Sequence, residues 1–312
     1  MRLWGSLLLA GLASGAVLSR SDTSNNALAA CPGYKASNVK TSNNGLTAQL
    51  SLAGKACNVY GNDLKDLILE VTYENDNRLH VKIQDAGNQV YQVPASVFPR
   101  PSDKSAASSN KLKFSYKANP FSFTVARRDT GEVLFDTSAA SLVFETQYLR
   151  LRTALPNDPY LYGLGEHSDP FRLNTTNYIR TLWNQDAYTI PNGANLYGDH
   201  PFYLEQRAHG AHGVFLLNSD GMDIMINQDA AGKQYLEYNS LGGGGGIGFV
   251  NFTPNDGSVL MTGVAPSGSS KTKARREKEA QDRRRRLSEA AMKAVAAAGG
   301  DIEKLRQQGF DL

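Results

Sequence analysis

The sequence is poor in cysteine and tryptophan, with two of each among 312 residues, and no apolar run beyond its N-terminus approaches the about 18 residues of a membrane span. Two cysteines alone make an incomplete metal site, so no metal is expected. No convincing amphipathic helix occurs before residue 270. These absences exclude a membrane-spanning protein, a cysteine-based metal protein and a helical bundle.

The N-terminus has the composition of a secretory signal peptide. Residues 1–20, MRLWGSLLLAGLASGAVLSR, combine an early arginine, a short apolar run and small residues at a cleavage position. Secretion into an oxidising compartment predicts a disulfide between Cys31 and Cys57. Two sequons predict glycosylation at Asn174 and Asn251. We therefore expect a secreted glycoprotein.

The net charge of +3 has a local origin. Residues 271–286, KTKARREKEAQDRRRR, are strongly basic, while the rest of the chain is net acidic. The main body therefore gives no electrostatic reason to bind nucleic acid or a membrane. The basic run has no interleaved aromatics for base stacking, and a nucleic-acid function for it conflicts with secretion. We expect residues 271–312 to form a solvated, partly helical tail.

Most of the chain alternates apolar and polar residues with a period of two. The alternating runs are 46–52, 67–74, 78–83, 121–128, 131–137, 142–152, 213–219 and 223–228, and turn residues separate them. This pattern predicts antiparallel strands joined as hairpins, and hence a large all-β sandwich.

The stretch LGGGGGIGF, residues 241–249, marks a change of character. Its glycines include the G-x-G-x-x-G pattern of a dinucleotide site, but β-branched and aromatic residues follow where that site needs a helix. No nucleotide or other cofactor is therefore expected. We interpret the glycines as the boundary at which one kind of sequence ends and another begins, with an irregular linker over residues 244–270.

Aromatic and acidic residues gather in the segment 160–203. Aromatic rings beside carboxylates suit sugars, whose apolar faces stack and whose hydroxyls donate hydrogen bonds. We expect Tyr162 and Phe171 to be core residues, and Glu166 and His167 to form a structural hydrogen-bonded pair. For Asp186, in a projecting loop after a tryptophan, a ligand contact is the favoured interpretation.

Four motifs in this region occur in a specific order: YGLGEH at 162–167, WNQDA at 183–187, NLYGDHPFY at 195–203 and GVFLLNSDGMDI at 213–224. Together they resemble the N-terminal domain of glycoside hydrolase family 31, the α-glucosidase family, with CPGYKASNV similar to its secreted fungal members. The resemblance implies a galactose-mutarotase-like β-sandwich over residues 21–243. It also implies that Asp186, with Gln185 and Trp183 beside it, contacts an α-linked glucose oligosaccharide.

In that family the sandwich leads into a (β/α)8 barrel that carries both catalytic carboxylates of a retaining hydrolysis. A barrel takes about 250 residues, whereas the sequence after Gly243 shows no strand–helix alternation and resembles no nucleophile segment. We therefore assign no catalytic residue and expect the chain to be inactive alone. The tail has no resemblance to the family. The alternative is a free-standing, non-catalytic carbohydrate-binding module.

Overall fold

The computed structural model describes residues 27–88, 90–102, 104–186, 189–243 and 245–252, all in the first of the chain's two units, residues 1–261. Within them sixteen β-strands pair in antiparallel ladders, which confirms the predicted fold class. No helix in these ranges is long and apolar enough to cross a membrane. The predicted signal peptide and basic tail lie outside the described residues.

The strands follow one another closely along the chain. They are β1 Tyr34–Ser42, β2 Gly45–Leu52, β3 Asp66–Asn75, β4 Arg78–Asp85, β5 Leu112–Ala118, β6 Phe121–Arg127, β7 Val133–Asp136, β8 Val143–Glu145, β9 Tyr148–Ala154, β10 Tyr160–Gly163, β11 Tyr178–Leu182, β12 Phe202–Arg207, β13 Gly210–Leu217, β14 Met222–Gln228, β15 Gln234–Ser240 and β16 Gly245–Phe252.

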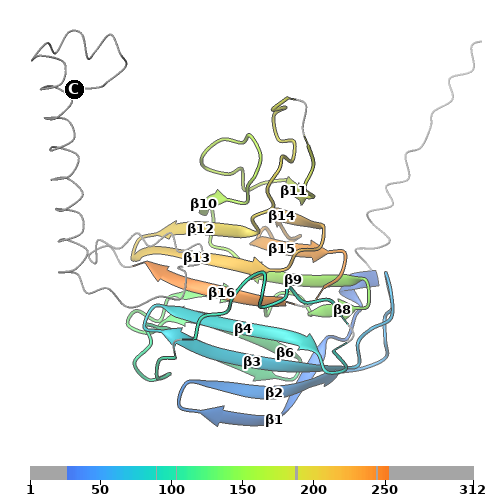
Figure 1. Cartoon of the computed structure of the whole chain (residues 1–312), viewed down its shortest axis with the longest axis vertical. Coiled ribbons are helices and arrows are strands. Elements are labelled where there is room, and N and C mark those ends of the chain that lie inside the picture. The colour runs from blue at the N-terminus through green and yellow to red at the C-terminus, as the bar shows by residue number, and fades with distance from the viewer. Residues whose placement is uncertain (1–26, 89, 103, 187–188, 244, 253–312) are drawn as a thin grey trace, which may run out of the picture. The chain divides into compact units, whose positions relative to one another are not determined.

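These strands form three sheets. The largest has the order β1-β2-β3-β4-β16-β13-β12-β10, the second β11-β14-β15-β9-β8 and the third β5-β6-β7. Figure 1 shows β16, the last of the described strands, between β4 and β13. It therefore completes the largest sheet in its middle rather than at an edge.

One cluster of buried side chains joins the three sheets. The rings of Phe123 on β6 and Phe135 on β7 have centroids 5.6 Å apart, and Phe135 meets Phe249 of β16 edge-on at 5.0 Å. All three side chains are buried. Burying such a side chain contributes roughly 1.5–3 kcal/mol, so this aromatic column links the three-stranded sheet to the eight-stranded one.

Two predictions about strand boundaries are wrong. The run 142–152 is not one strand, because the chain turns back after Glu145, which lies opposite Tyr148 in a hairpin. The predicted linker 244–270 is also wrong in its first part, since residues 245–252 form β16; residues 253–270 lie outside the described ranges. Strand β16 forms because Ile247 and Phe249 alternate into the core while two neighbouring strands supply hydrogen bonds.

Candidate functional site

The sequence motifs of the segment 160–203 meet where the 183–199 loop leaves β11 and returns to β12 (Figure 1). The backbone N–H of Gln185 donates to Leu196 O at 3.0 Å, and that of Leu196 donates to Glu166 O at 3.0 Å. The N–H of His200 donates to Gly165 O at 2.7 Å. Backbone hydrogen bonds therefore join three of the four motifs to one another.

Side-chain amides and one carboxylate fix the base of the 183–199 loop. Asp199 Oδ2 accepts a hydrogen bond from the backbone N–H of Asn184 at 3.0 Å, and Asn184 Nδ2 donates to Tyr197 O at 2.9 Å. Asn195 Nδ2 donates to Trp183 O. These bonds replace strand pairing where the backbone is irregular, so the loop base has a defined shape.

The fourth motif contributes the support of the tryptophan. A Cβ atom on Gly221 would lie only 2.3 Å from Cε3 of Trp183, so the indole packs directly over the glycine backbone. Even so, 57% of Trp183 remains exposed. The ring is therefore held from one side and open to solvent on the rest of its surface, a geometry suited to stacking on a ligand.

A shallow, open pocket of about 350 Å³ lies at the base of this loop. Its lining residues are Ile179, Arg180, Thr181, Trp183, Gln185, Gly193 and Asn195. Gln185 donates from Nε2 to Asn195 O at 2.9 Å, which orients its amide. Of the three predicted sugar-binding residues, the structure thus brings Trp183 and Gln185 into one pocket. Asp186 is exposed and is not among the residues that line it.

An ionic cluster that the sequence did not predict lies beside the same pocket, because Arg180 belongs to both. Asp169 Oδ2 accepts hydrogen bonds from Arg180 Nε at 2.6 Å and from the Tyr178 hydroxyl at 2.8 Å, and His167 Nε2 lies 2.8 Å from the same oxygen. A Cβ on Gly193 of the loop would lie 3.2 Å from Arg180 Nη2. Strand β11 and the loop therefore pack through Arg180.

The charges of this cluster balance. Burial alone would raise the pKa of Asp169, but hydrogen bonds from Arg180 and Tyr178 outweigh burial and lower it. Burial lowers the pKa of His167 despite the opposing effect of Asp169. Near neutral pH the carboxylate and the guanidinium therefore carry opposite charges beside an uncharged imidazole, and the cluster adds no net charge to the pocket.

The expected pair between Glu166 and His167 does not form. Glu166 Oε2 accepts instead from the backbone N–H of Gly198 at 2.9 Å, while His167 contacts Asp169 and the hydroxyl of Tyr178. Both residues have structural partners, as expected, but different ones. Glu166 therefore finds its partner 32 residues along the chain, whereas Asp169, the partner of His167, is two residues away.

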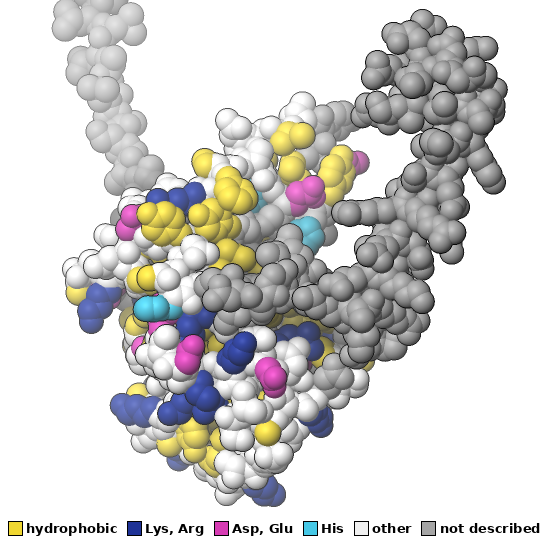
Figure 2. Space-filling model, turned by 90° about the vertical axis from the view of Figure 1, so that its left-hand side faces the viewer, with side chains coloured by type: hydrophobic (Ala, Val, Ile, Leu, Met, Phe, Trp, Pro, Cys, Tyr) yellow, Lys and Arg dark blue, Asp and Glu magenta, His cyan; other side chains and the backbone are white. Residues whose placement is uncertain are grey.

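Large apolar side chains are exposed in the same region. They are Tyr160, Phe171, Ile179, Trp183, Ile190 and Tyr197. Figure 2 shows hydrophobic side chains gathered on the upper part of the described unit. The prediction of Phe171 as a core residue is wrong, since it is 87% exposed; its ring lies beside that of the half-buried Tyr162, with centroids 4.9 Å apart. Exposed apolar area of this kind marks an interaction surface or an aggregation risk.

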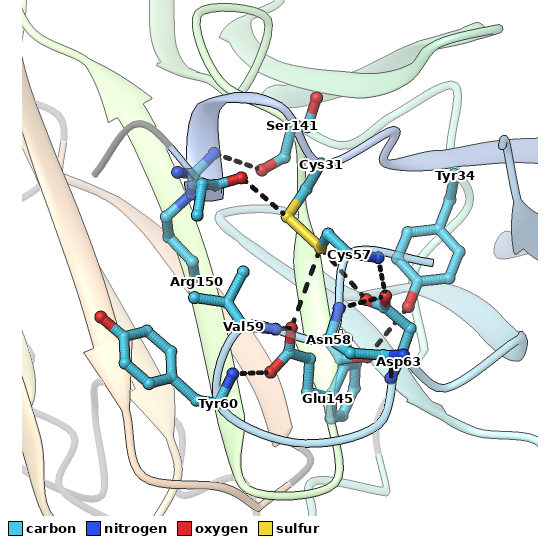
Figure 3. The surroundings of a disulfide bond; sticks show 12 residues. Cys31, Tyr34, Cys57, Asn58, Val59, Tyr60, Asp63, Ser141, Glu145 and Arg150 are labelled. Carbon is cyan, nitrogen blue, oxygen red and sulfur yellow. Dashed lines mark hydrogen bonds between the residues drawn. A yellow bond between two sulfur atoms is a disulfide. The ribbon is translucent and has the colours of Figure 1, made fainter. Parts of the chain in front are cut away.

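Cys31 and Cys57 form a disulfide (Figure 3). The carboxylates of Asp63 and Glu145 lie beside it and accept hydrogen bonds of 2.5–3.0 Å from backbone N–H groups of residues 57–60. Cys57, Asp63 and Glu145 are close enough to suggest a metal site. Their ligand atoms are already used by the disulfide and the loop, so this cluster is structural.

The two predicted glycosylation sites differ in exposure. Asn174 is exposed, and its Oδ1 accepts from the backbone N–H of Thr176 at 3.1 Å. Asn251 is buried at 6% exposure in β16, and its Oδ1 accepts a hydrogen bond from Arg127. A glycan needs an accessible side-chain nitrogen, so the burial of Asn251 argues against a glycan there, and both sites stay predictions.

Two family models match the chain. The glycosyl hydrolase 31 N-terminal galactose mutarotase-like domain matches residues 63–224. The WetA C-terminal domain matches residues 249–310, which begin inside β16.

Similar proteins point the same way as the first model. A probable alpha/beta-glucosidase of Aspergillus fumigatus is 59% identical over 256 residues, which cover 81% of this chain and 28% of that protein. An alpha-glucosidase of Schizosaccharomyces pombe is 40% identical over 232 residues, covering 68% of this chain and 23% of that protein. The chain thus spans about a quarter of the length of these relatives.

The fold also has solved counterparts. A structure of the ER glucosidase II complex, made of the catalytic subunit and the binding domain of the regulatory subunit, superposes with a TM-score of 0.59. The match covers 74% of this chain and 34% of that chain at 15% identity. This likeness supports the sandwich fold predicted from the four motifs.

Proposed function

The chain belongs to glycosyl hydrolase family 31 through its N-terminal galactose mutarotase-like domain, and from this we propose that the 183–199 loop contacts α-linked glucose. The observation that carries the proposal is the fixed loop base, which holds Trp183 and Gln185 on one pocket and leaves Asp186 exposed. The proposed substrate class is an α-glucosidic oligosaccharide, handled in carbohydrate metabolism.

Each of the three side chains suits one part of a sugar. The exposed face of Trp183 offers a stacking surface for the apolar face of a pyranose ring. Gln185 presents an amide that both donates and accepts, and the carboxylate of Asp186 accepts hydrogen bonds from hydroxyl groups. A charged acceptor strengthens such bonds, so Asp186 is the strongest single contact of the three.

We assign the chemistry of the parent reaction to other residues. Retaining hydrolysis of an α-glucosidic bond needs a nucleophilic carboxylate and an acid/base carboxylate about 5 Å apart. In this proposal the sandwich recognises the substrate and a catalytic barrel, as in the family, supplies both carboxylates. The purified 312-residue chain should therefore release no glucose from maltose.

A domain exchange tests the role of Asp186. In a hybrid enzyme, residues 27–243 would replace the matching segment of the Aspergillus fumigatus relative, and maltose hydrolysis would be measured. Asp186→Ala should lower kcat/KM about 10- to 100-fold, because a hydrogen bond to a charged group contributes about 1.5–3 kcal/mol. Asp129→Ala, an exposed carboxylate in the turn after β6, is the control and should have no effect. An active hybrid that is insensitive to Asp186→Ala would refute the proposed contact.

We also assign the chain to the extracellular space. The signal-peptide pattern of residues 1–20 and the disulfide support this, because disulfides persist in oxidising compartments. Mass spectrometry of the product secreted by a fungal host should find cleavage near residue 20, a glycan on Asn174 and none on Asn251. A cell-retained product that still begins at Met1 would contradict secretion.

A further inference from the structure

The disulfide region holds more ligand atoms than its two cysteines provide. We propose that, once the bond between Cys31 and Cys57 is reduced, both sulfurs bind Zn²⁺ together with the carboxylates of Asp63 and Glu145. The proposal is independent of sugar recognition, since none of these residues belongs to the 183–199 loop. It concerns the thiol form of the chain, in which the newly made protein exists before its disulfide forms.

Both carboxylates point toward the sulfur of Cys57 (Figure 3). Cys57 Sγ lies 3.6 Å from Asp63 Oδ1 and 3.8 Å from Glu145 Oε1. A disulfide sulfur carries no hydrogen, so neither contact is a hydrogen bond. Within the described residues Asp63 Oδ1 therefore has no proton donor, although Asp63 is only 8% exposed. A buried carboxylate oxygen without a partner is costly, and a cation beside the sulfur would supply that partner.

The distances between these atoms suit tetrahedral zinc. Zinc lies about 2.3 Å from sulfur and about 2.0–2.2 Å from carboxylate oxygen, which places sulfur and oxygen ligands about 3.5–3.7 Å apart. The two observed sulfur–oxygen distances, 3.6 and 3.8 Å, already have this spacing. The three ligand atoms lie within 4.8 Å of one another. Two oxygens on zinc are about 3.4 Å apart, so the carboxylates need to approach each other by no more than about 1.4 Å.

Backbone groups hold both carboxylates in this arrangement. Asp63 and Glu145 accept hydrogen bonds of 2.5–3.0 Å from N–H groups of residues 57–60. These bonds use the other oxygen of Asp63 and only one lone pair of Glu145 Oε1, which keeps a second lone pair for a cation. Hydrogen-bonded carboxylates are the usual form of carboxylate ligand in protein metal sites, because the bonds fix their orientation. Two of the four ligands are therefore already in position.

The ligand set selects zinc over calcium and magnesium. Calcium and magnesium prefer oxygen ligands alone, whereas zinc accepts both thiolate and carboxylate. Two thiolates and two carboxylates carry the same total charge as four thiolates, so the filled site would have the net charge of a Cys₄ zinc site. In the oxidised chain the sulfurs carry no charge and are bonded to each other. We therefore expect metal binding by the reduced chain only.

The site opens only when a reductant supplies two electrons. A water-soluble phosphine does this in the test: phosphorus becomes the phosphine oxide, water provides its oxygen and two protons, and the S–S bond breaks into two thiols. Metal binding then forms two metal–thiolate bonds and should release about two protons to the solvent.

Cobalt(II) tests the geometry of the site, because its visible absorption is strong in a tetrahedral site. The reduced full chain should bind one Co²⁺ with tetrahedral visible bands and a thiolate-to-cobalt charge-transfer band. Zn²⁺ should displace it with a dissociation constant on the order of 1 μM or tighter, and the oxidised chain should show no such bands. A reduced chain that keeps its circular dichroism but shows none of these bands would overturn the proposal. Where reduction unfolds the chain, Zn²⁺ should restore the near-ultraviolet circular dichroism, and its failure to do so would also overturn it.

Substitutions of the carboxylates test the two oxygen ligands. Glu145→Gln and Asp63→Asn keep the shape of each side chain but remove its charge, and each should weaken Zn²⁺ binding at least about tenfold. Glu70→Gln, at an exposed carboxylate on β3, is the control and should stay within about twofold. If Glu145→Gln does not fold, Asp63→Asn carries the test. Unchanged Zn²⁺ affinity in a folded carboxylate variant would show that the sulfurs hold the metal alone and would refute the proposed site.

Discussion

Gly221, in the turn between β13 and β14, leaves room for the indole of Trp183, since a Cβ there would lie 2.3 Å from the ring. The requirement is steric rather than conformational, because this glycine is not among those with a positive φ. Trp183 in turn is mostly exposed, so the ring has space to move away. An added methyl group at this site should therefore displace the indole of Trp183 more than it destabilises the fold.

Gly221→Ala should displace the indole without unfolding the protein. We expect acrylamide to quench Trp183 emission more strongly in a chain that carries Trp4→Phe and so keeps Trp183 as its one tryptophan, while the free energy of unfolding changes by less than about 1 kcal/mol. Gly248→Ala is the matched control, because a Cβ on Gly248 would be 3.9 Å from its nearest neighbour, an ordinary contact. Equal quenching in the parent and Gly221→Ala proteins would show that the glycine does not set the position of the ring.

At this scale, sequence reasoning found side chains but not their partners. Trp183 and Gln185 were reached through the resemblance of the WNQDA motif to the family, and their contact with sugar stays a prediction. The pairing of Asp169 with Arg180 could not, because the two residues lie on different segments and no local pattern joins them. The one available signal was an acidic residue before the strand β11 and a basic residue within it, which together suggest an ion pair.

Among the elements, β16 shows where pattern reading fails. Its glycines suggest a linker because glycine weakens strands, yet Ile247 and Phe249 keep the alternation of a strand and are buried. A Cβ on Gly246 would lie 1.8 Å from His80 Nε2 of β4, so close packing between the two strands requires that glycine. Long alternating runs such as β3 and β13 were predictable, because burial on one face fixed their residue types. Strand β16 depends on two neighbours that the local sequence does not reveal.

For the whole described unit, β16 joins two halves of the largest sheet. It pairs with β13 at seven positions and with β4 at six. The galactose mutarotase-like match ends at residue 224, and the WetA C-terminal domain match begins at residue 249, inside a buried strand of the sandwich. The described part of the sandwich therefore extends to Phe252, beyond the boundary expected near Gly243.

Two shortened chains should separate these limits. A chain ending at residue 252 keeps every described core residue, which all lie between Leu28 and Phe249, and should unfold in urea with the cooperativity and midpoint of the full chain. A chain ending at residue 243 loses both ladders of β16 together with Ile247 and Phe249. Burial of each of these side chains contributes roughly 1.5–3 kcal/mol, a large share of the about 5–15 kcal/mol of a typical domain. It should therefore lose near-ultraviolet circular dichroism and a sharp transition, whereas equal stability of the two chains would show that β4 and β13 hold together without the strand between them.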